Sequence, residues 1–157
     1  MSRVTRATKA LEGAGIACTV HAYDYDPDAE QIGMQAAEAM GEEPARVLKT
    51  LMAMVDGKPV CVIVPSDREV SMKRLAAAFG GKSAQMMRPA EAERLSGYKV
   101  GGISPFGQMR RPKVAIEEQA LAHDLVYING GQRGLQVRLN PRDAAKVLEA
   151  VVVGVVA

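Results

Sequence analysis

The stretch Val47-Leu48-Lys49-Thr50-Leu51-Met52-Ala53-Met54-Val55 is the part of the sequence that predicts the fold most clearly. A second apolar run, 60–64, follows it, and Asp56-Gly57 between the two runs suits a type I′ turn. We therefore predict a β-hairpin with Lys49 on a rigid strand. Because a charged amine is costly to bury without a partner, Lys49 is either an edge residue whose ammonium group reaches solvent or the chemical centre of a pocket.

Outside this hairpin, apolar periodicity and turn residues predict a mixture of helices and strands. The predicted helices are 4–11, 28–40, 72–79, 89–95 and a last helix opened by Asn140-Pro141. The other predicted strands are 16–23, 84–87, 114–116, 125–128 and 135–139, and 150–157 is expected to be a final strand or a packed terminus. Since helices and strands do not alternate strictly, we predict an α+β fold, in which one domain (1–157) has a mixed, curved β-sheet surrounded by helices.

Composition narrows the class of protein. The chain has 157 residues, 48% hydrophobic and 24% charged, which excludes disorder and a coiled coil. The first residues lack the apolar core of a signal peptide, and no stretch approaches the about 20 apolar residues that cross a bilayer. We expect a cytoplasmic protein without a membrane partner. Cys18 and Cys61 have no cysteine or histidine at ligand spacing, so no metal site is predicted.

Charge is unevenly distributed, although the net charge is only +2. Residues 20–45 contain seven acids and no lysine or arginine, whereas 65–113 contain ten bases and four acids. The basic region would attract a polyanion such as nucleic acid, or its residues are solvated helix faces. Within it, Arg110, Arg111 and Lys113 lie close together without an acid. We predict that these three residues contact phosphate groups.

Two glycine loops, Gly101-Gly102-Ile103-Ser104-Pro105 and Asn129-Gly130-Gly131-Gln132-Arg133-Gly134, could expose backbone N–H groups to a ligand. The usual signatures of nucleotide cofactors, serine hydrolases and zinc proteases are absent from the sequence, so no cofactor is predicted. The two histidines, His21 and His123, lack neighbours that would mark a catalytic triad. His21 precedes Tyr23 near a strand end, where it could form a pocket wall.

Three segments together resemble the YbaK family of aminoacyl-tRNA deacylases. They are 47–51, 97–107 and 130–135, and the resemblance runs from about residue 10 to residue 148. These free-standing proteins are similar to the editing domain inserted in bacterial prolyl-tRNA synthetase. The pair His21-x-Tyr23 makes the chain most similar to the Cys-tRNA(Pro) deacylase branch.

The resemblance implies a mechanism without a protein nucleophile. The thiolate of the substrate cysteine attacks its own ester carbonyl, and the protein positions and polarises the ester. On this interpretation Lys49 is the catalytic residue, contacting the terminal phosphate or ribose or supporting charge at the ester. The residues expected to bind the aminoacyl end are Tyr23, Thr50, Gly101, Gly102, Ile103, Ser104, Pro105, Asn129, Gly130, Gly131 and Gln136.

Two positions depart from the family pattern. Asn129 stands where a small serine is common, and Gln136 stands where an acid commonly follows Arg-Gly-Leu. The leading hypothesis is a trans-editing deacylase for Cys-tRNA(Pro), extending to Cys-tRNA(Cys), recruited to prolyl-tRNA synthetase. The alternatives are a deacylase that uses water to remove another small residue such as alanine, and a non-catalytic module that binds tRNA or another nucleic acid.

Overall fold

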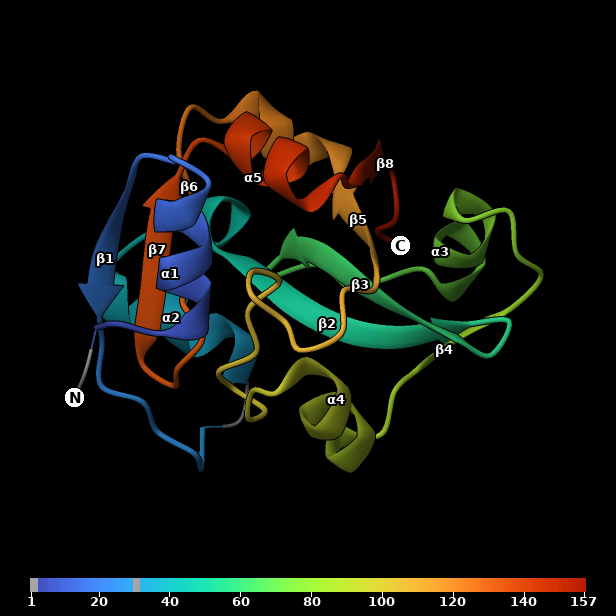
Figure 1. The fold of residues 1–157 in the computed structure, drawn as a ribbon, viewed down its shortest axis with the longest axis horizontal. Helices are drawn as coiled ribbons and strands as arrows, with labels where there is room; N and C mark the ends of the chain where they lie inside the picture. Colours follow the sequence, from blue (N-terminus) through green and yellow to red (C-terminus); the bar gives the residue numbers. More distant parts are fainter. Residues whose placement is uncertain (1–2, 30–31) are drawn as a thin grey trace.

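The predicted hairpin forms the centre of the larger of two sheets in the computed structural model, which describes residues 3–29 and 32–157 (Figure 1). Strands β2 (Leu48–Val55) and β3 (Lys58–Pro65) pair without a register break from Leu48 opposite Pro65 to Val55 opposite Lys58. Asp56 and Gly57 have φ values of 49° and 80°. A type I′ turn needs positive φ at both positions, so the turn prediction is confirmed.

Three further strands complete this sheet, whose order is β4-β2-β3-β5-β8. Strand β5 (Lys113–Glu117) runs parallel to β3, and β8 (Val151–Val153) runs parallel to β5. Strand β4 (Ala84–Met86) is antiparallel to β2 but pairs only with its end, Ala53–Val55. Within the described residues, no strand covers the other half of this β2 edge, from Leu48 to Met52.

The smaller sheet is antiparallel, with the order β1-β7-β6. Its strands are β1 (Cys18–Ala22), β6 (Val126–Asn129) and β7 (Leu135–Leu139). A single parallel bridge between Val47 and Tyr127 connects β2 to this sheet. The α+β class is confirmed, and the strands divide between two sheets that meet where β2 begins.

Five α-helices in the described part of the chain lie around the sheets. They are α1 (Arg6–Gly13), α2 (Ile32–Met40), α3 (Met72–Ala78), α4 (Pro89–Ser96) and α5 (Pro141–Leu148), with short 3₁₀ helices η1 (Pro44–Arg46) and η2 (Glu118–Ala122). In Figure 1, α4 lies below the β2–β3 hairpin and α5 above it. None of the helices among the described residues is long and apolar enough to span a bilayer.

Side-chain caps set where three helices begin. The hydroxyls of Thr5 and Ser71 and the amide of Asn140 accept backbone N–H groups of the first turns of α1, α3 and α5. The caps at Ser71 and Asn140 were predicted, whereas α1 begins after Thr5 and not at Val4. The predicted helix 28–40 is described from Ile32, and residues 30–31 lie outside the described residues.

The hairpin is buried on both faces. Leu48 and Met52 join Cys61 and Ile63 in the main core, while Ala53 and Val55 on the other face pack in a second core with Leu75 and Val155. Burial raises the pKa of Cys61 to about 12. Each large apolar side chain buried in this way contributes about 1.5–3 kcal/mol. The strand is therefore a rigid platform for its one lysine.

A buried carboxylate anchors the segment after β8. Glu117 is fully buried, and its Oε1 accepts the N–H groups of Val155 and Val156 at 2.8 and 3.1 Å. Its Oε2 accepts the N–H of Gln119 at 3.1 Å. These three charge-assisted hydrogen bonds compensate for burying the charge and fix the position of segment 155–157.

We predict that Glu117→Gln lowers the free energy of unfolding by about 1–3 kcal/mol, because the amide loses the charge and turns an N–H donor toward a backbone donor. Urea unfolding followed by circular dichroism measures the change. Glu118→Gln is the matched control, since Glu118 is exposed. Equal stability of the two variants would contradict this account of Glu117.

The two glycine loops pack closely against each other. A Cβ atom on Gly102 would lie 2.7 Å from the backbone N of Arg133 and 2.9 Å from the carbonyl carbon of Gln132. Only a residue without a side chain allows the two backbones this approach. Glycine at position 102 therefore allows the first loop to pack directly against the backbone of the second.

We predict that Gly102→Ala costs about 1–3 kcal/mol of stability, because the added methyl group forces the two loops apart. Gly13→Ala is the control, since a Cβ there meets nothing within 4 Å. Thermal unfolding compares the two variants. A Gly102→Ala protein as stable as the wild type would show that the loops tolerate separation.

Candidate functional site

A cavity of about 380 Å³ opens along the uncovered edge of β2, where the two sheets meet. Seven of the predicted site residues line it: Tyr23, Lys49, Thr50, Gly101, Ile103, Asn129 and Gln136. They come from β2, from the first glycine loop, from β6 and β7, and from the segment after β1. Residues distant in the sequence are thus brought together at one place.

The other five predicted substrate-binding residues do not line this cavity. Gly102, Ser104 and Pro105 are buried, and Pro105 borders a different groove, while Gly130 and Gly131 follow Asn129 in the chain. The Ser104 hydroxyl accepts the N–H of Phe106 at 3.2 Å, and the Ser104 carbonyl accepts the Gln108 side-chain amide at 3.0 Å. These groups shape the loop that borders the cavity.

Asn129 links the two glycine loops. Its Nδ2 donates to the carbonyl of Gly101 at 3.0 Å, and its Oδ1 accepts the N–H of Gly131 at 2.7 Å. Both ends of the amide are therefore used within the protein. A serine side chain is shorter and would have to make both contacts through one oxygen atom, whereas asparagine has two separate polar atoms.

Most of the glycine N–H groups are paired inside the protein. Gly102 donates to Lys99 at 2.7 Å, Gly130 donates to Leu135 at 2.8 Å, and Gly131 donates to Asn129. In contrast, the N–H groups of Gly101 and Ile103 have no hydrogen-bond partner among residues 3–29 and 32–157. Of the N–H groups in the first loop, these two are the ones whose residues border the cavity, so they are the available donors.

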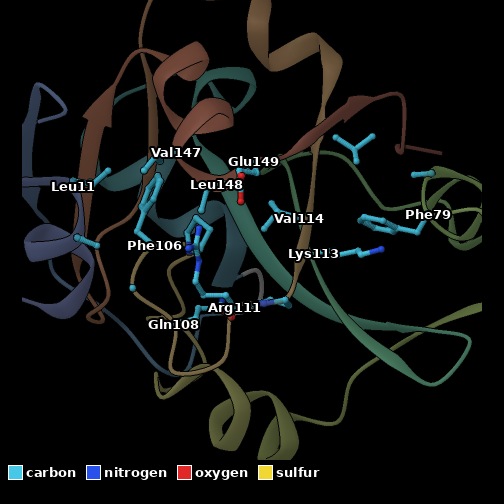
Figure 2. A pocket seen from close by; sticks show the side chains of 16 residues that line it. Leu11, Phe79, Phe106, Gln108, Arg111, Lys113, Val114, Val147, Leu148 and Glu149 are labelled. Carbon is cyan, nitrogen blue, oxygen red and sulfur yellow. The ribbon is translucent and has the colours of Figure 1, made fainter. Parts of the chain in front are cut away.

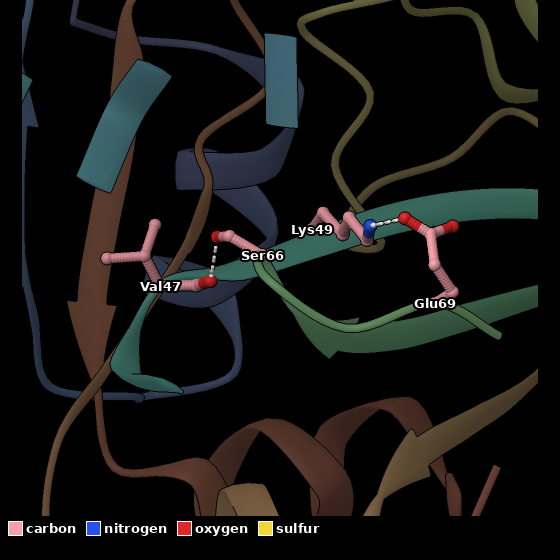
Figure 3. Close-up of polar contacts among 4 residues, drawn as sticks. All are labelled: Val47, Lys49, Ser66 and Glu69. Atoms are coloured by element: carbon pink, nitrogen blue, oxygen red, sulfur yellow. Dashed lines mark hydrogen bonds and ion pairs between the residues drawn. The ribbon is translucent and has the colours of Figure 1, made fainter. Parts of the chain in front are cut away.

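Lys49 is the only charged residue among the described residues that line the cavity. Its side chain is 17% exposed, and its Nζ lies 3.7 Å from Oε1 of Glu69 (Figure 3). The Glu69 side chain is 86% exposed. Beside this pair, the hydroxyl and N–H of Ser66 both donate to the carbonyl of Val47 and close the end of the hairpin.

Thr50 presents polar groups to the open edge of β2. The carbonyl of Met52 accepts the N–H of Met87 on this edge, at 3.0 Å. Alternate residues of a strand direct their backbone groups to the same edge, so the N–H and C=O of Thr50 face the cavity. Its buried Oγ1 also has no partner within the described part of the chain.

Gln136 and Tyr23 form the opposite wall. Gln136 is 4% exposed, and its Oε1 has no hydrogen-bond partner among the described residues. Burial raises the pKa of the Tyr23 hydroxyl, and hydrogen bonds with the Gly134 backbone and the Gln136 side chain oppose that shift. A buried acceptor without a partner costs about 1–3 kcal/mol, which a donor on a ligand would recover.

Three methionines supply an apolar wall that was not predicted from the sequence. Met52, Met86 and Met87 line the cavity beside Ile103. Methionine is flexible and polarizable, so this wall suits a small methyl or thiol side chain. The signal was present in the pair Met86-Met87 at the end of β4, but the pair could not be located at the cavity without the fold.

The three predicted phosphate-binding residues lie elsewhere. Arg110, Arg111 and Lys113 are exposed and do not line the cavity at β2. Arg111 and Lys113 border a separate groove of about 940 Å³. Figure 2 shows them on one side of it, with Val147 and Leu148 of α5 on the other.

The two histidines and the two cysteines are also outside the cavity. His21 Nε2 lies 2.8 Å from the Thr19 hydroxyl, and the ring packs edge-on against Tyr127. Burial and the nearby Arg138 lower the pKa of His21. In the described part of the chain, no group of histidine, cysteine and acidic residues could hold a metal ion. The cavity thus offers one cation, unpaired N–H donors and unpaired oxygen acceptors to a ligand.

Comparisons with known proteins place most of the chain in one family. Residues 26–147 match the family model of the aminoacyl-tRNA editing domain. A protein of Enterococcus faecalis named "Putative Cys-tRNA(Pro)/Cys-tRNA(Cys) deacylase EbsC" is 33% identical over 106 residues, which cover 67% of this chain and 65% of that protein. A proline–tRNA ligase of Acidithiobacillus ferrooxidans is 30% identical over 105 residues, which cover 60% of this chain and 18% of the ligase.

A solved structure shows the same fold. The crystal structure of "a putative trans-editing enzyme for prolyl tRNA synthetase" superposes with a TM-score of 0.81 and 21% identity, over 97% of this chain and 95% of that one. The fold class predicted from the sequence is therefore shared with a known structure, and the resemblance drawn from the three motifs is confirmed by the family model. This chain belongs to the aminoacyl-tRNA editing domain family.

Proposed function

We propose that the protein is a trans-editing deacylase that removes cysteine from mischarged Cys-tRNA(Pro), and also from Cys-tRNA(Cys). The observation that carries the proposal is the composition of the cavity at β2. Its described lining provides one cation and several unpaired hydrogen-bonding groups, but no cysteine, histidine or carboxylate. Such a site is suited to holding an ester whose own side chain supplies the nucleophile.

In the proposed reaction the cysteine thiol of the substrate loses its proton, and the thiolate sulfur attacks the ester carbonyl carbon. The bond from that carbon to the ribose oxygen then breaks, which releases a thiolactone, and the ribose oxygen takes up a proton. Intramolecular attack has a large proximity advantage. The N–H groups of Gly101 and Ile103 would donate to the developing oxyanion, and Lys49 would support that charge or hold the terminal phosphate or ribose.

The amino group of the substrate would be held between β2 and the opposite wall. Thr50 Oγ1 and Gln136 Oε1 are unpaired acceptors in the described structure, and an ammonium group provides the donors that they lack. Gln136 is neutral, where an acid would attract the ammonium group more strongly. Asn129 would act indirectly, because its amide already joins the two loops.

A second candidate is a deacylase that removes alanine by water attack. The methionine wall favours it, because Met52, Met86 and Met87 provide apolar contact for a methyl group as well as for a thiol. A binding module without turnover is the third candidate. It would use the basic groove at Arg111 and Lys113 and leave the cavity at β2 without a chemical role.

The tRNA body would be contacted outside the cavity. Arg110, Arg111 and Lys113 are exposed, and no ion pair involves them within the described part of the chain. They are therefore available to phosphate groups. We infer that few contacts read the tRNA itself, so recruitment to prolyl-tRNA synthetase would supply the tRNA identity. The similarity of this chain to part of a proline–tRNA ligase supports this choice of partner.

We predict that single-turnover reactions remove cysteine from Cys-tRNA(Pro) at least about 100-fold faster than alanine or serine from the corresponding tRNAs, because only cysteine carries the thiolate nucleophile. Lys49→Ala should lower the cysteine rate by about 10²–10³, the range for loss of one group that stabilises an oxyanion. Lys58→Ala is the control, since Lys58 is an exposed lysine at the turn of the same hairpin.

Other outcomes separate the three candidates. If alanine and serine were removed as fast as cysteine, the nucleophile would be water and not the substrate thiolate. An active Lys49→Ala protein would remove Lys49 from the mechanism. Binding of tRNA without turnover of any substrate would overturn the deacylase and leave the binding module.

A further inference from the structure

Lys49, whose proposed role in the reaction is assumed here, forms an ion pair with Glu69. Among the described residues, Glu69 is the one acid that pairs with this lysine, at 3.7 Å (Figure 3). The lysine side chain is 17% exposed and the glutamate side chain is 86% exposed. A ligand can therefore approach the pair from the side of the carboxylate.

The backbone of Glu69 is fixed although its side chain lies in solvent. Its carbonyl accepts the N–H of Ala157 at 2.8 Å, and Val70 forms an antiparallel bridge with Val156. The N–H of Ser71 donates to the carbonyl of Val155 at 2.7 Å. Segment 155–157 is anchored in turn by the buried carboxylate of Glu117. Glu69 thus extends toward Lys49 from a rigid base.

The pair is also weak enough to exchange. An exposed carboxylate is well hydrated, and a separation of 3.7 Å is longer than a charge-assisted hydrogen bond. A phosphate group of RNA carries the same charge sign and would compete for the same ammonium group. Without such a ligand, Glu69 keeps the lysine charge compensated at the rim of the cavity.

We propose that Glu69 is a positioning residue for Lys49, an exchangeable counter-ion that gives way to a backbone phosphate at the acceptor end of the substrate RNA. The free protein holds the ammonium group on Glu69, and substrate binding transfers it to the phosphate. The exchange affects the apparent affinity for the substrate. The rate of ester cleavage in the enzyme–substrate complex does not depend on Glu69.

Steady-state deacylation of Cys-tRNA(Pro) at low salt tests the exchange with Glu69→Gln. The expected result is a KM about two- to fivefold lower than in the wild type, the range for loss of an exposed ion pair, with kcat unchanged within about twofold. Asp67→Asn is the matched control, because Asp67 is an exposed acid of the same loop without an ion pair in the described structure. In a Lys49→Ala background, Glu69→Gln should have no larger effect than Asp67→Asn. Equal KM values for the two single variants, or an effect that persists without Lys49, would overturn the proposal.

Chemical labelling of Lys49 keeps this test separate from the proposed function. An amine-directed acylating reagent, followed by peptide mass spectrometry, should modify Lys49 at least about twofold faster in Glu69→Gln than in Asp67→Asn, because the carboxylate no longer holds the ammonium group. An acceptor-stem minihelix of tRNA(Pro) without an attached amino acid should protect Lys49 from labelling. In Glu69→Gln this protection should need a minihelix concentration about two- to fivefold lower than in Asp67→Asn. If no aminoacyl-tRNA is turned over, the proposed deacylase function is wrong. The labelling experiment still tests whether Lys49 exchanges Glu69 for a phosphate group. Identical labelling and protection in both variants would contradict it.

Discussion

Strand β2 is buried on both faces, yet half of one edge has no neighbouring strand in the described structure. This constraint determines the rest of the site. The two packed faces keep the strand rigid, so the backbones of Thr50 and Lys49 hold fixed positions. The open edge leaves polar backbone groups that need partners. A cavity between the two sheets is the place where a ligand can supply them.

The loops around this edge are built for support as much as for binding. Asn129 uses both ends of its amide to join Gly101 to Gly131, and Gly102 lets the loops touch through their backbones. The N–H groups of Gly101 and Ile103 remain available, whereas those of Gly102, Gly130 and Gly131 are spent on internal bonds. Asparagine in place of the serine common in the family therefore changes how the loops are held. Gln136 lines the cavity, and it is a neutral acceptor at a position where the family resemblance implies an acid.

Local signals predicted the elements well. Asp56-Gly57 gave the hairpin turn, Ser71 and Asn140 gave helix starts, and each of these depends on a few neighbouring residues. The split into two sheets was not predicted, because strand order depends on contacts between distant segments such as Val47 and Tyr127. The same reason explains why only part of the candidate site could be predicted from the sequence. Lys49 was predicted from its apolar surroundings and lines the cavity, whereas the methionine wall and the pairing of Glu69 with Lys49 carry no local mark and depend on the fold.

The glycine loops show a second limit of sequence reasoning. Glycine at a position indicates close backbone approach, but it does not say whether the partner is a ligand or another loop. For Gly102 the structure shows another loop, at Arg133. Which N–H groups are left for a ligand depends on every hydrogen bond in the region, and this can be counted only in three dimensions.

The central claim is that the aminoacyl end of the substrate binds at the open edge of β2. The most direct test is a crystal structure with cysteinyl-adenosine in which a stable amide replaces the ester. The account predicts the cysteine side chain beside Met52 and Met87, the amino group at Gln136 and the carbonyl oxygen at the N–H groups of Gly101 and Ile103. A ligand bound in the groove at Arg111 and Lys113, with the cavity at β2 unchanged, would contradict the account.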